Sequence, residues 1–199
     1  MRSISELEFS EQFEPIMHRV FSQLNPYGQP FHGSVRHRRL LYPFTYALSE
    51  PWLQPITEGM RQLGEDAFLV SALNRPDPQN VSQFEYHWRV DIKEVNKYRE
   101  LVYSQENAIY SINGFWGIIC SGEDHALFGG SKAICGLIDH QVPDMEERLS
   151  KFVADWKYYH TDRGIELDWL YPMLAHVVGE EQAKVLLRSE GLEWLIRSD

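Results

Sequence analysis

Apolar side chains recur at helical spacing near the start of the chain and at strand spacing in its middle. Between residues 9 and 24 an apolar position returns every three or four residues, which predicts an amphipathic helix. The same spacing predicts a second helix over 51–63, with Ser49 as its candidate cap. From residue 66 to residue 129 the apolar positions alternate with polar ones or form short runs, so this region is predicted to be the sheet.

The first two strands of that region are predicted at 66–74 and 83–91, separated by the turn-rich segment 74–80. In the second strand, apolar residues such as Phe84 alternate with polar residues such as His87. We therefore expect one face of this strand to be packed and the other to meet solvent.

The segment 107–129 gives the strongest local signal in the chain. Asn113-Gly114 stands between two apolar runs and is a preferred sequence for a type I′ hairpin turn. A four-residue loop would then return the chain and place Gly117 opposite Phe128. Both faces of the resulting three-stranded meander are apolar, so we expect helices to cover both.

After residue 130 the spacing is helical again, and 131–197 is predicted as a helical part. The order of helices, strands and helices favours one α+β domain over residues 1–199. Its antiparallel or mixed sheet should contain about five strands. N-terminal and C-terminal helices should flank that sheet.

The composition is consistent with a packed α+β domain and also predicts where in the cell the protein is found. A chain of 199 residues with 43% hydrophobic residues can bury a core without disulfides or metals. Cys120 and Cys135 are the only cysteines, and the N-terminus lacks the apolar block of a signal peptide. We expect two buried thiols in a cytoplasmic protein, with no membrane association and no cofactor.

The net charge of −10 indicates which class of partner to expect. After Gly122 the chain has eight basic and fifteen acidic residues, so most of the excess negative charge lies there. Such a charge repels nucleic acid and attracts basic proteins. Within 144–168, acidic and aromatic residues interleave, a composition suited to gripping a basic protein. The candidate partner-binding residues are Asp144, Glu147, Asp155, Tyr159, Asp162 and Glu166.

These features favour a non-enzymatic protein-binding module. Its specific form would be an acidic inhibitor, or a bacterial immunity-type protein, that neutralises a basic partner such as a toxin nuclease. The alternative for the same residues is an ordinary solvated helix face with the tryptophans in the core.

A small enzyme is the second interpretation. The predicted loop 121–124 places Cys120 opposite His125, and Asp124 could orient the histidine. A thiol beside an imidazole is a source of thiolate at neutral pH. The alternative is that Cys120 is a small buried residue at the end of a strand.

An RNA-binding accessory protein is the third interpretation. Arg36, Arg38 and Arg39 form a basic cluster with aromatic residues around it, in a segment predicted to be a loop. Pairing of these arginines with the chain's own acidic helices is the alternative.

Two further patterns lack the spacing of an established site. The run from Gly129 to Lys132 does not match a phosphate-binding loop, because Ser131 precedes the lysine instead of following it. Nearby pairs such as His160 with Asp162 lack the ligand spacing of a metal site, so we predict no bound metal.

Overall fold

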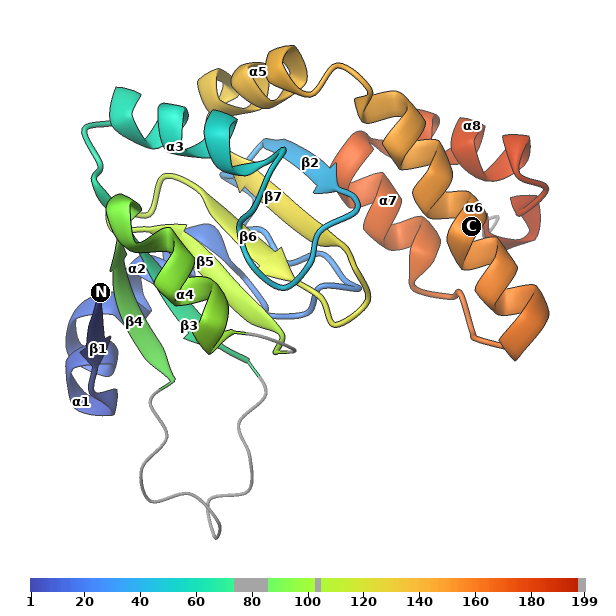
Figure 1. Cartoon of the computed structure of the whole chain (residues 1–199). Coiled ribbons are helices and arrows are strands. Elements are labelled where there is room, and N and C mark those ends of the chain that lie inside the picture. The colour runs from blue at the N-terminus through green and yellow to red at the C-terminus, as the bar shows by residue number, and fades with distance from the viewer. Residues whose placement is uncertain (74–85, 103–104, 197–199) are drawn as a thin grey trace, which may run out of the picture.

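The computed structural model describes residues 1–73, 86–102 and 105–196. These residues form an α+β protein built on a seven-stranded sheet, shown in Figure 1. The strand order is β1-β4-β3-β5-β6-β7-β2, and every neighbouring pair is antiparallel. The α+β class is therefore confirmed, whereas the expected count of about five strands is too low.

Both edge strands come from segments that the periodicity did not assign to the sheet. The strands are β1 (Arg2–Ile4), β2 (His37–Leu41), β3 (Ala67–Ala72), β4 (His87–Asp91), β5 (Asn107–Ser111), β6 (Gly117–Cys120) and β7 (Ala126–Gly130). β2 contains Arg38 and Arg39, which were expected in a loop. Only Leu40 and Leu41 are buried in it, so it shows no alternation of apolar and polar residues.

The helices lie before, within and after the strands. They are α1 (Glu6–Glu8), the π-helical turn η1 (Phe9–Phe13), α2 (Glu14–Val20), α3 (Leu53–Gln62), the 3-10 turn η3 (Ile92–Glu94), α4 (Val95–Leu101), α5 (Lys132–Gln141), α6 (Met145–Arg163), α7 (Leu170–Val178), α8 (Glu180–Ser189) and the 3-10 turn η4 (Glu193–Leu195). The helix expected over 9–24 ends at Val20, because Phe21 is extended and forms a β-bridge with Phe31.

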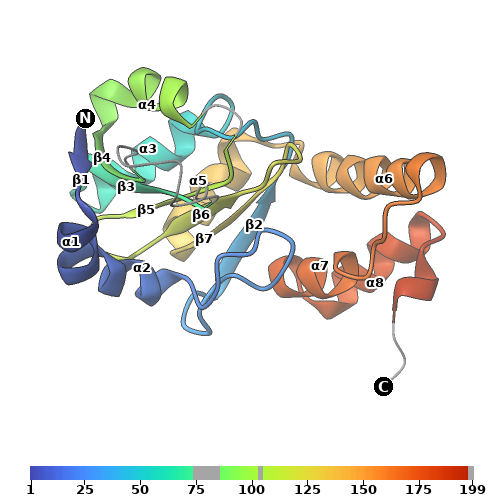
Figure 2. The same cartoon turned by 90° about the horizontal axis from the view of Figure 1, so that it is seen from below.

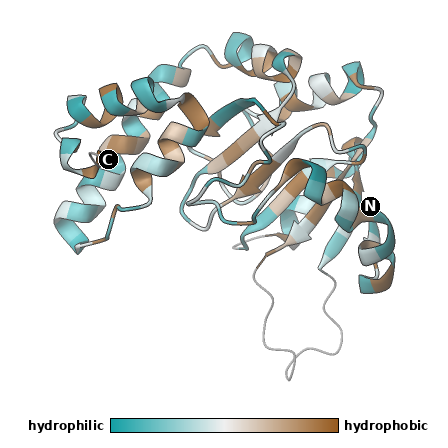
Figure 3. Cartoon of the chain, turned by 180° about the vertical axis from the view of Figure 1, so that it is seen from behind, coloured by the Kyte–Doolittle hydropathy of each residue, from teal (hydrophilic) through white to brown (hydrophobic). Residues whose placement is uncertain are grey.

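Helices cover both faces of the sheet, as Figure 2 shows. α3, α4 and α5 pack on one face, which includes Phe68, Ile109 and Ile118. α1 and α2 lie on the other face, and α6, α7 and α8 extend beside β2 instead of covering a face squarely. The hydrophobic residues concentrate in the central strands, while the outer helices carry both kinds of residue (Figure 3).

The β5–β6 hairpin has the predicted register but not the predicted turn. Tyr110 pairs with Gly117 as expected. Of the two turn residues only Gly114 has a positive φ, at 77°, so the turn is not type I′. The side chain of Asn113 instead donates to buried Glu65 at 2.9 Å, and Trp116 Nε1 donates to the same carboxylate at 2.8 Å. These bonds anchor the turn to Glu65, which lies two residues before β3.

The β6–β7 register differs from the prediction by one residue. The connecting loop has five residues, 121–125, and is closed by the N–H of Ser121 donating to the carbonyl of His125 at 2.9 Å. Cys120 therefore pairs with Ala126, not with His125. A shift of one residue moves every side chain to the other face. Phe128 accordingly packs on the face of α3 and α5, not beside Tyr110.

A shallow depression in the sheet receives the segment that follows α2. Gly117 and Gly129 are cross-strand partners, which corrects the prediction that Gly117 faces Phe128. A Cβ at Gly117 would lie 2.5 Å from the Phe21 ring, and one at Gly129 would lie 2.6 Å from the Phe31 ring. The two glycines thus admit two buried rings at close range.

β4 also departs from its prediction. His87 is buried, with a ring centroid 3.5 Å from that of Phe9, so the face expected to meet solvent is covered by η1. The predicted turn 74–80 and position Phe84 lie outside the described residues. Within the described ranges, no helix combines the length and apolar character needed to cross a bilayer.

Candidate functional site

Carboxylates and tyrosines from separate parts of the chain gather around the β6–β7 loop. Tyr27 follows α2, two further tyrosines follow β2, Glu106 precedes β5, and Asp155 lies on α6. We call this surface the acidic tyrosine face. Its members are Tyr27, Tyr42, Tyr46, Glu106, Glu123, Asp124 and Asp155.

Hydrogen bonds hold the members of this face in place. The Tyr42 hydroxyl donates to Asp155, which also accepts from Lys151 Nζ at 2.7 Å. The Tyr46 hydroxyl donates to the carbonyl of Gly122 at 3.1 Å. These bonds join the segment after β2 both to α6 and to the β6–β7 loop.

Burial and nearby negative charge keep Tyr27 and Tyr42 protonated. Burial, followed by the charges of Glu123 and Glu106, raises the pKa of Tyr27 well above its usual value. Burial and the hydrogen bond to Asp155 raise the pKa of Tyr42 in the same direction. These two phenol groups therefore remain hydrogen-bond donors beside carboxylate acceptors at physiological pH.

The backbone of this face takes uncommon conformations. Among the described residues, Tyr46 (φ 44°) and Asp124 (φ 55°) are the two non-glycine positions with positive φ. Such values are uncommon outside glycine and cost conformational energy. Surrounding bonds fix both positions: Asn107 Nδ2 donates to the Tyr46 carbonyl at 2.6 Å, and Phe44 N–H donates to the Asp124 carbonyl at 2.7 Å.

The acidic residues predicted on α6 are partly neutralised by basic residues of the same helix. Asp144 pairs with Arg148 at 2.9 Å, and Asp162 lies 3.8 Å from Arg163. Exposed ion pairs of this kind contribute little to stability, but they reduce the net charge that a partner would meet. Of the predicted acidic residues, Asp155 alone belongs to the acidic tyrosine face.

The remaining predicted partner-binding residues lie elsewhere on the C-terminal part. Glu147 and Glu166 are exposed and form no ion pair with another described residue. Tyr159 is half-buried against Trp156, and the Arg163 guanidinium lies over its ring at 5.1 Å. The predicted set is therefore spread along α6, from its N-cap Asp144 to Glu166 just beyond its end, with Asp155 alone in the acidic tyrosine face.

The predicted Cys120–Asp124–His125 unit does not assemble. Cys120 lies in the core on the face of α3 and α5, where burial raises the pKa of its thiol. His125 points to the opposite face, with its ring stacked 6.1 Å from Trp169. The additional residue in the β6–β7 loop explains the separation, since it moves His125 out of the pairing with Cys120.

A buried serine–histidine pair was not foreseen. Ser71 Oγ lies 2.8 Å from His87 Nδ1, and Glu6 lies 3.5 Å from His87 Nε2. The order of groups is that of a nucleophile, a base and a carboxylate. However, Ser71 is only 2% exposed, and Phe9 covers the imidazole. The sequence offered no signal for this pair, because its members come from β3, β4 and α1.

The three arginines of the predicted nucleic-acid site have different roles. Arg39 Nε donates to Asp139 of α5 at 2.6 Å, and Arg38 Nη1 donates to the carbonyl of His176 on α7 at 2.7 Å. Burial and the charge of Arg38 lower the pKa of His176 to about 4, so this histidine is neutral beside the guanidinium. Arg36 is exposed and forms no ion pair with a described residue.

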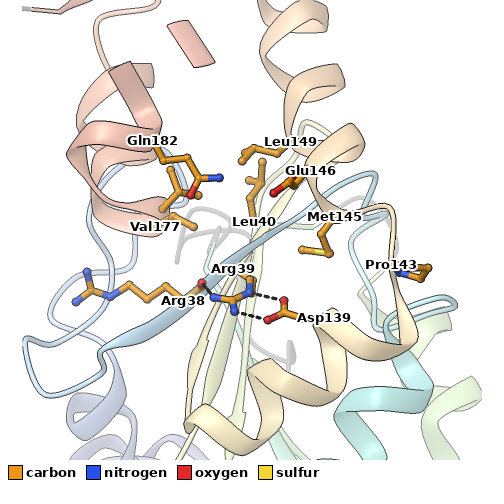
Figure 4. A pocket seen from close by; sticks show the side chains of 11 residues that line it. Arg38, Arg39, Leu40, Asp139, Pro143, Met145, Glu146, Leu149, Val177 and Gln182 are labelled. Carbon is orange, nitrogen blue, oxygen red and sulfur yellow. Dashed lines mark hydrogen bonds and ion pairs between the residues drawn. The ribbon is translucent and has the colours of Figure 1, made fainter. Parts of the chain in front are cut away.

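A cavity of about 430 Å³ lies between β2 and the C-terminal helices (Figure 4). Leu40, Leu149 and Val177 form its apolar walls, and the Arg39–Asp139 pair lies at its floor. Arg38 also lines it, with its guanidinium extending away from the other labelled side chains. Both arginines are therefore used in holding β2 to helices.

Neither a group of metal ligands nor a comparison with known proteins identifies a ligand for this site. Across the described ranges, no group of three or more histidine, cysteine, aspartate or glutamate side chains is placed to hold a metal ion. No protein family model, curated protein or solved structure matches the chain.

Proposed function

We propose that the protein binds a basic partner protein, as an inhibitor or immunity-type protein that covers the working surface of a basic toxin such as a nuclease. The acidic tyrosine face is the observation that carries this proposal. It sets four carboxylates around three partly exposed tyrosines on a chain of net charge −10. We place this binding in the cytoplasm, where the buried thiols of Cys120 and Cys135 remain reduced.

Each group in the face has a distinct role in binding. The carboxylates accelerate encounter with a positive surface and accept bidentate hydrogen bonds from arginine. The tyrosine rings provide rigid apolar contact area, and their hydroxyls take up polar contacts. Since the loops are already tied together by hydrogen bonds, little ordering is required when the partner binds.

The test begins with capture of partners from lysate of the native host at low salt. A captured basic protein is then purified, and its affinity is measured by calorimetry for two variants of equal charge. The first combines Glu106→Gln, Glu123→Gln and Asp124→Asn, which preserve hydrogen-bonding capacity; asparagine also tolerates the positive φ at 124. The control combines Glu11→Gln, Glu190→Gln and Glu193→Gln, which lie outside the face. Both sets lower the formal net charge from −10 to −7.

We expect the first variant to bind at least about tenfold more weakly and the control to bind as the wild type does, because local charge decides the contact. Binding should also weaken as salt is raised, since the steering charges are exposed. An equal loss of affinity in the two variants would show that the net charge of the chain, and not this face, accounts for binding. Failure to capture any basic protein at low salt would count against the proposal as a whole.

A further inference from the structure

A second hollow, which shares no lining residue with the cavity beside the C-terminal helices, collects basic residues on this acidic chain. It has a volume of about 340 Å³. Four segments form it: the end of α2, the start of β2, the β5–β6 turn and the junction of β7 with α5. Its lining residues are Arg19, Ser34, Val35, Arg36, His37, Gly114, Phe115, Gly130 and Ser131.

The charge of this hollow is positive and uncompensated. Two arginines and a histidine line it, whereas none of its lining residues is acidic. Within the described part of the chain, Arg19 and Arg36 form no ion pair, in contrast to Arg39, which Asp139 holds. Lys132 follows the lining residue Ser131 directly and is also exposed. An anion is the ligand that such a group of side chains favours.

Packing positions Arg19, and helix capping positions Ser131, without an acidic partner. The stem of Arg19 packs on the β5–β6 turn, where a Cβ at Gly114 would lie 3.2 Å from its Cδ atom. The guanidinium is thereby directed by packing and not by an acidic partner. Ser131 caps α5 by accepting from the N–H of Ile134, so the first turn of that helix adds partial positive charge at the same end.

Phe115 gives the hollow an aromatic wall. It is 53% exposed, whereas the strand residues 107–111 and 116–120 on either side of its turn are buried. An exposed aromatic ring beside arginines is the arrangement that stacks a nucleobase while the arginines bind its phosphate. Val35 supplies a second apolar contact.

We propose that this hollow binds a phosphorylated nucleoside, with the phosphate between Arg19 and Arg36 and the base on Phe115. The ligand is either a free nucleotide or the phosphorylated end of a short single strand; both present the same chemistry. The volume of about 340 Å³ suits one such unit. The surrounding net charge of −10 disfavours a long polyanion, which would extend beyond the hollow.

Isothermal calorimetry with three probes tests the proposal: ATP, a 5′-phosphorylated hexathymidylate and inorganic phosphate. The key variant is the double change Arg19→Ala with Arg36→Ala. Phe115→Ala is the second variant, and Arg188→Ala is the control, because Arg188 is an exposed arginine on α8 outside the hollow. Circular dichroism of each variant confirms that it is folded.

We expect the double variant to weaken binding of ATP or of the oligonucleotide by at least about tenfold, with Arg188→Ala unchanged. Phe115→Ala should weaken these two probes by about tenfold but leave inorganic phosphate unaffected, because phosphate has no base to stack. Tighter binding of ATP than of the strand would identify a free nucleotide, and the reverse order would identify a strand end.

Two results would overturn the proposal. One is the absence of any binding of ATP and of the oligonucleotide at millimolar concentration. The other is binding that the arginine and phenylalanine changes leave intact, because the ligand would then lie elsewhere. The hollow shares no residue with the acidic tyrosine face, so these results bear on the nucleotide site alone and not on binding of a basic protein.

Discussion

His125 shows how a single residue couples the fold to pH. Its Nδ1 atom lies 2.8 Å from Ser121 Oγ, and its ring is enclosed by Tyr27, Trp156 and Trp169. Burial among these rings lowers the pKa of the imidazole to about 4. The side chain is therefore neutral in the folded protein at neutral pH.

Acid should destabilise the protein through this residue. The unfolded chain takes up a proton near pH 6.5, the ordinary value, whereas folded His125 does so only near pH 4. The contribution to stability is complete above pH 6.5 and falls by roughly 3 kcal/mol as pH drops to 4. Half-buried His176 titrates over the same range. Urea unfolding between pH 4 and pH 7 should give a shallower pH slope for His125→Gln; an unchanged slope would contradict the assignment.

At the same scale, the pairing of individual residues was only partly predictable. The apolar runs on either side of Asn113 and Gly114 were sufficient to set the register of Tyr110 with Gly117. They did not reveal the side-chain bond from Asn113 to Glu65, which comes from a distant segment and changes the turn type. Long-range hydrogen bonds of this kind leave no periodic pattern in the sequence.

At the scale of elements, the Gly117–Gly129 pair determines how closely the segment after α2 approaches the sheet. The Phe21 and Phe31 side chains are both buried and occupy the space that a Cβ on either glycine would need. In contrast, Gly136 of α5 is exposed, and nothing lies within 4 Å of a Cβ added there. The two kinds of glycine should respond oppositely to the same substitution.

We expect Gly117→Ala to lower the free energy of unfolding by about 1–3 kcal/mol, because the added methyl lies 2.5 Å from a buried ring. Gly136→Ala should raise it by about 0.5–1 kcal/mol through better helix propensity. The urea midpoints of the two variants and the wild type, measured by circular dichroism, give these changes in stability. If both substitutions raised the free energy of unfolding, the depression in the sheet at Gly117 would have to accommodate the added methyl by a small rearrangement.

The elements were easier to predict than the edges of the sheet or the site. Long periodic segments, such as the apolar stripe of α6, are visible in sequence because burial repeats every turn. β2 was missed because its arginines hide the pattern, although Arg38 and Arg39 serve to fasten this strand to α7 and α5. The acidic tyrosine face was foreseen only at Asp155, since Asp124 was predicted in a different role, beside Cys120 and His125. Its other members are isolated residues in loops, and only the fold brings them together.

At the scale of the whole molecule, one apolar cluster runs from the sheet into the C-terminal helices. Leu69 and Tyr110 in the sheet belong to the same cluster as Leu187 of α8. α7 contacts β2, and Arg38 adds a hydrogen bond between them. This continuity leads us to expect that the sheet and the C-terminal helices unfold together.

Leu187→Ala tests that expectation. Its side chain is fully buried, so its truncation should lower the free energy of unfolding by about 2–5 kcal/mol. Val185→Ala in the same helix is the matched control, because Val185 is 63% exposed and its loss should cost at most about 0.5 kcal/mol. Far-ultraviolet and near-ultraviolet circular dichroism should report one transition that moves as a unit. Two separate transitions, with only one shifted by Leu187→Ala, would divide the chain into two domains.

The aromatic cluster around His125 has a practical consequence for following binding. Trp169 is half-buried, and its ring centroid lies 5.0 Å from that of Tyr27 in the acidic tyrosine face. The indole is also stacked on the His125 imidazole. A macromolecule that settles over Tyr27 changes the solvent exposure of this indole, and indole emission depends on the polarity of its surroundings. The native chain thus carries an intrinsic fluorophore beside the surface proposed for its partner, and complex formation can be followed without a label.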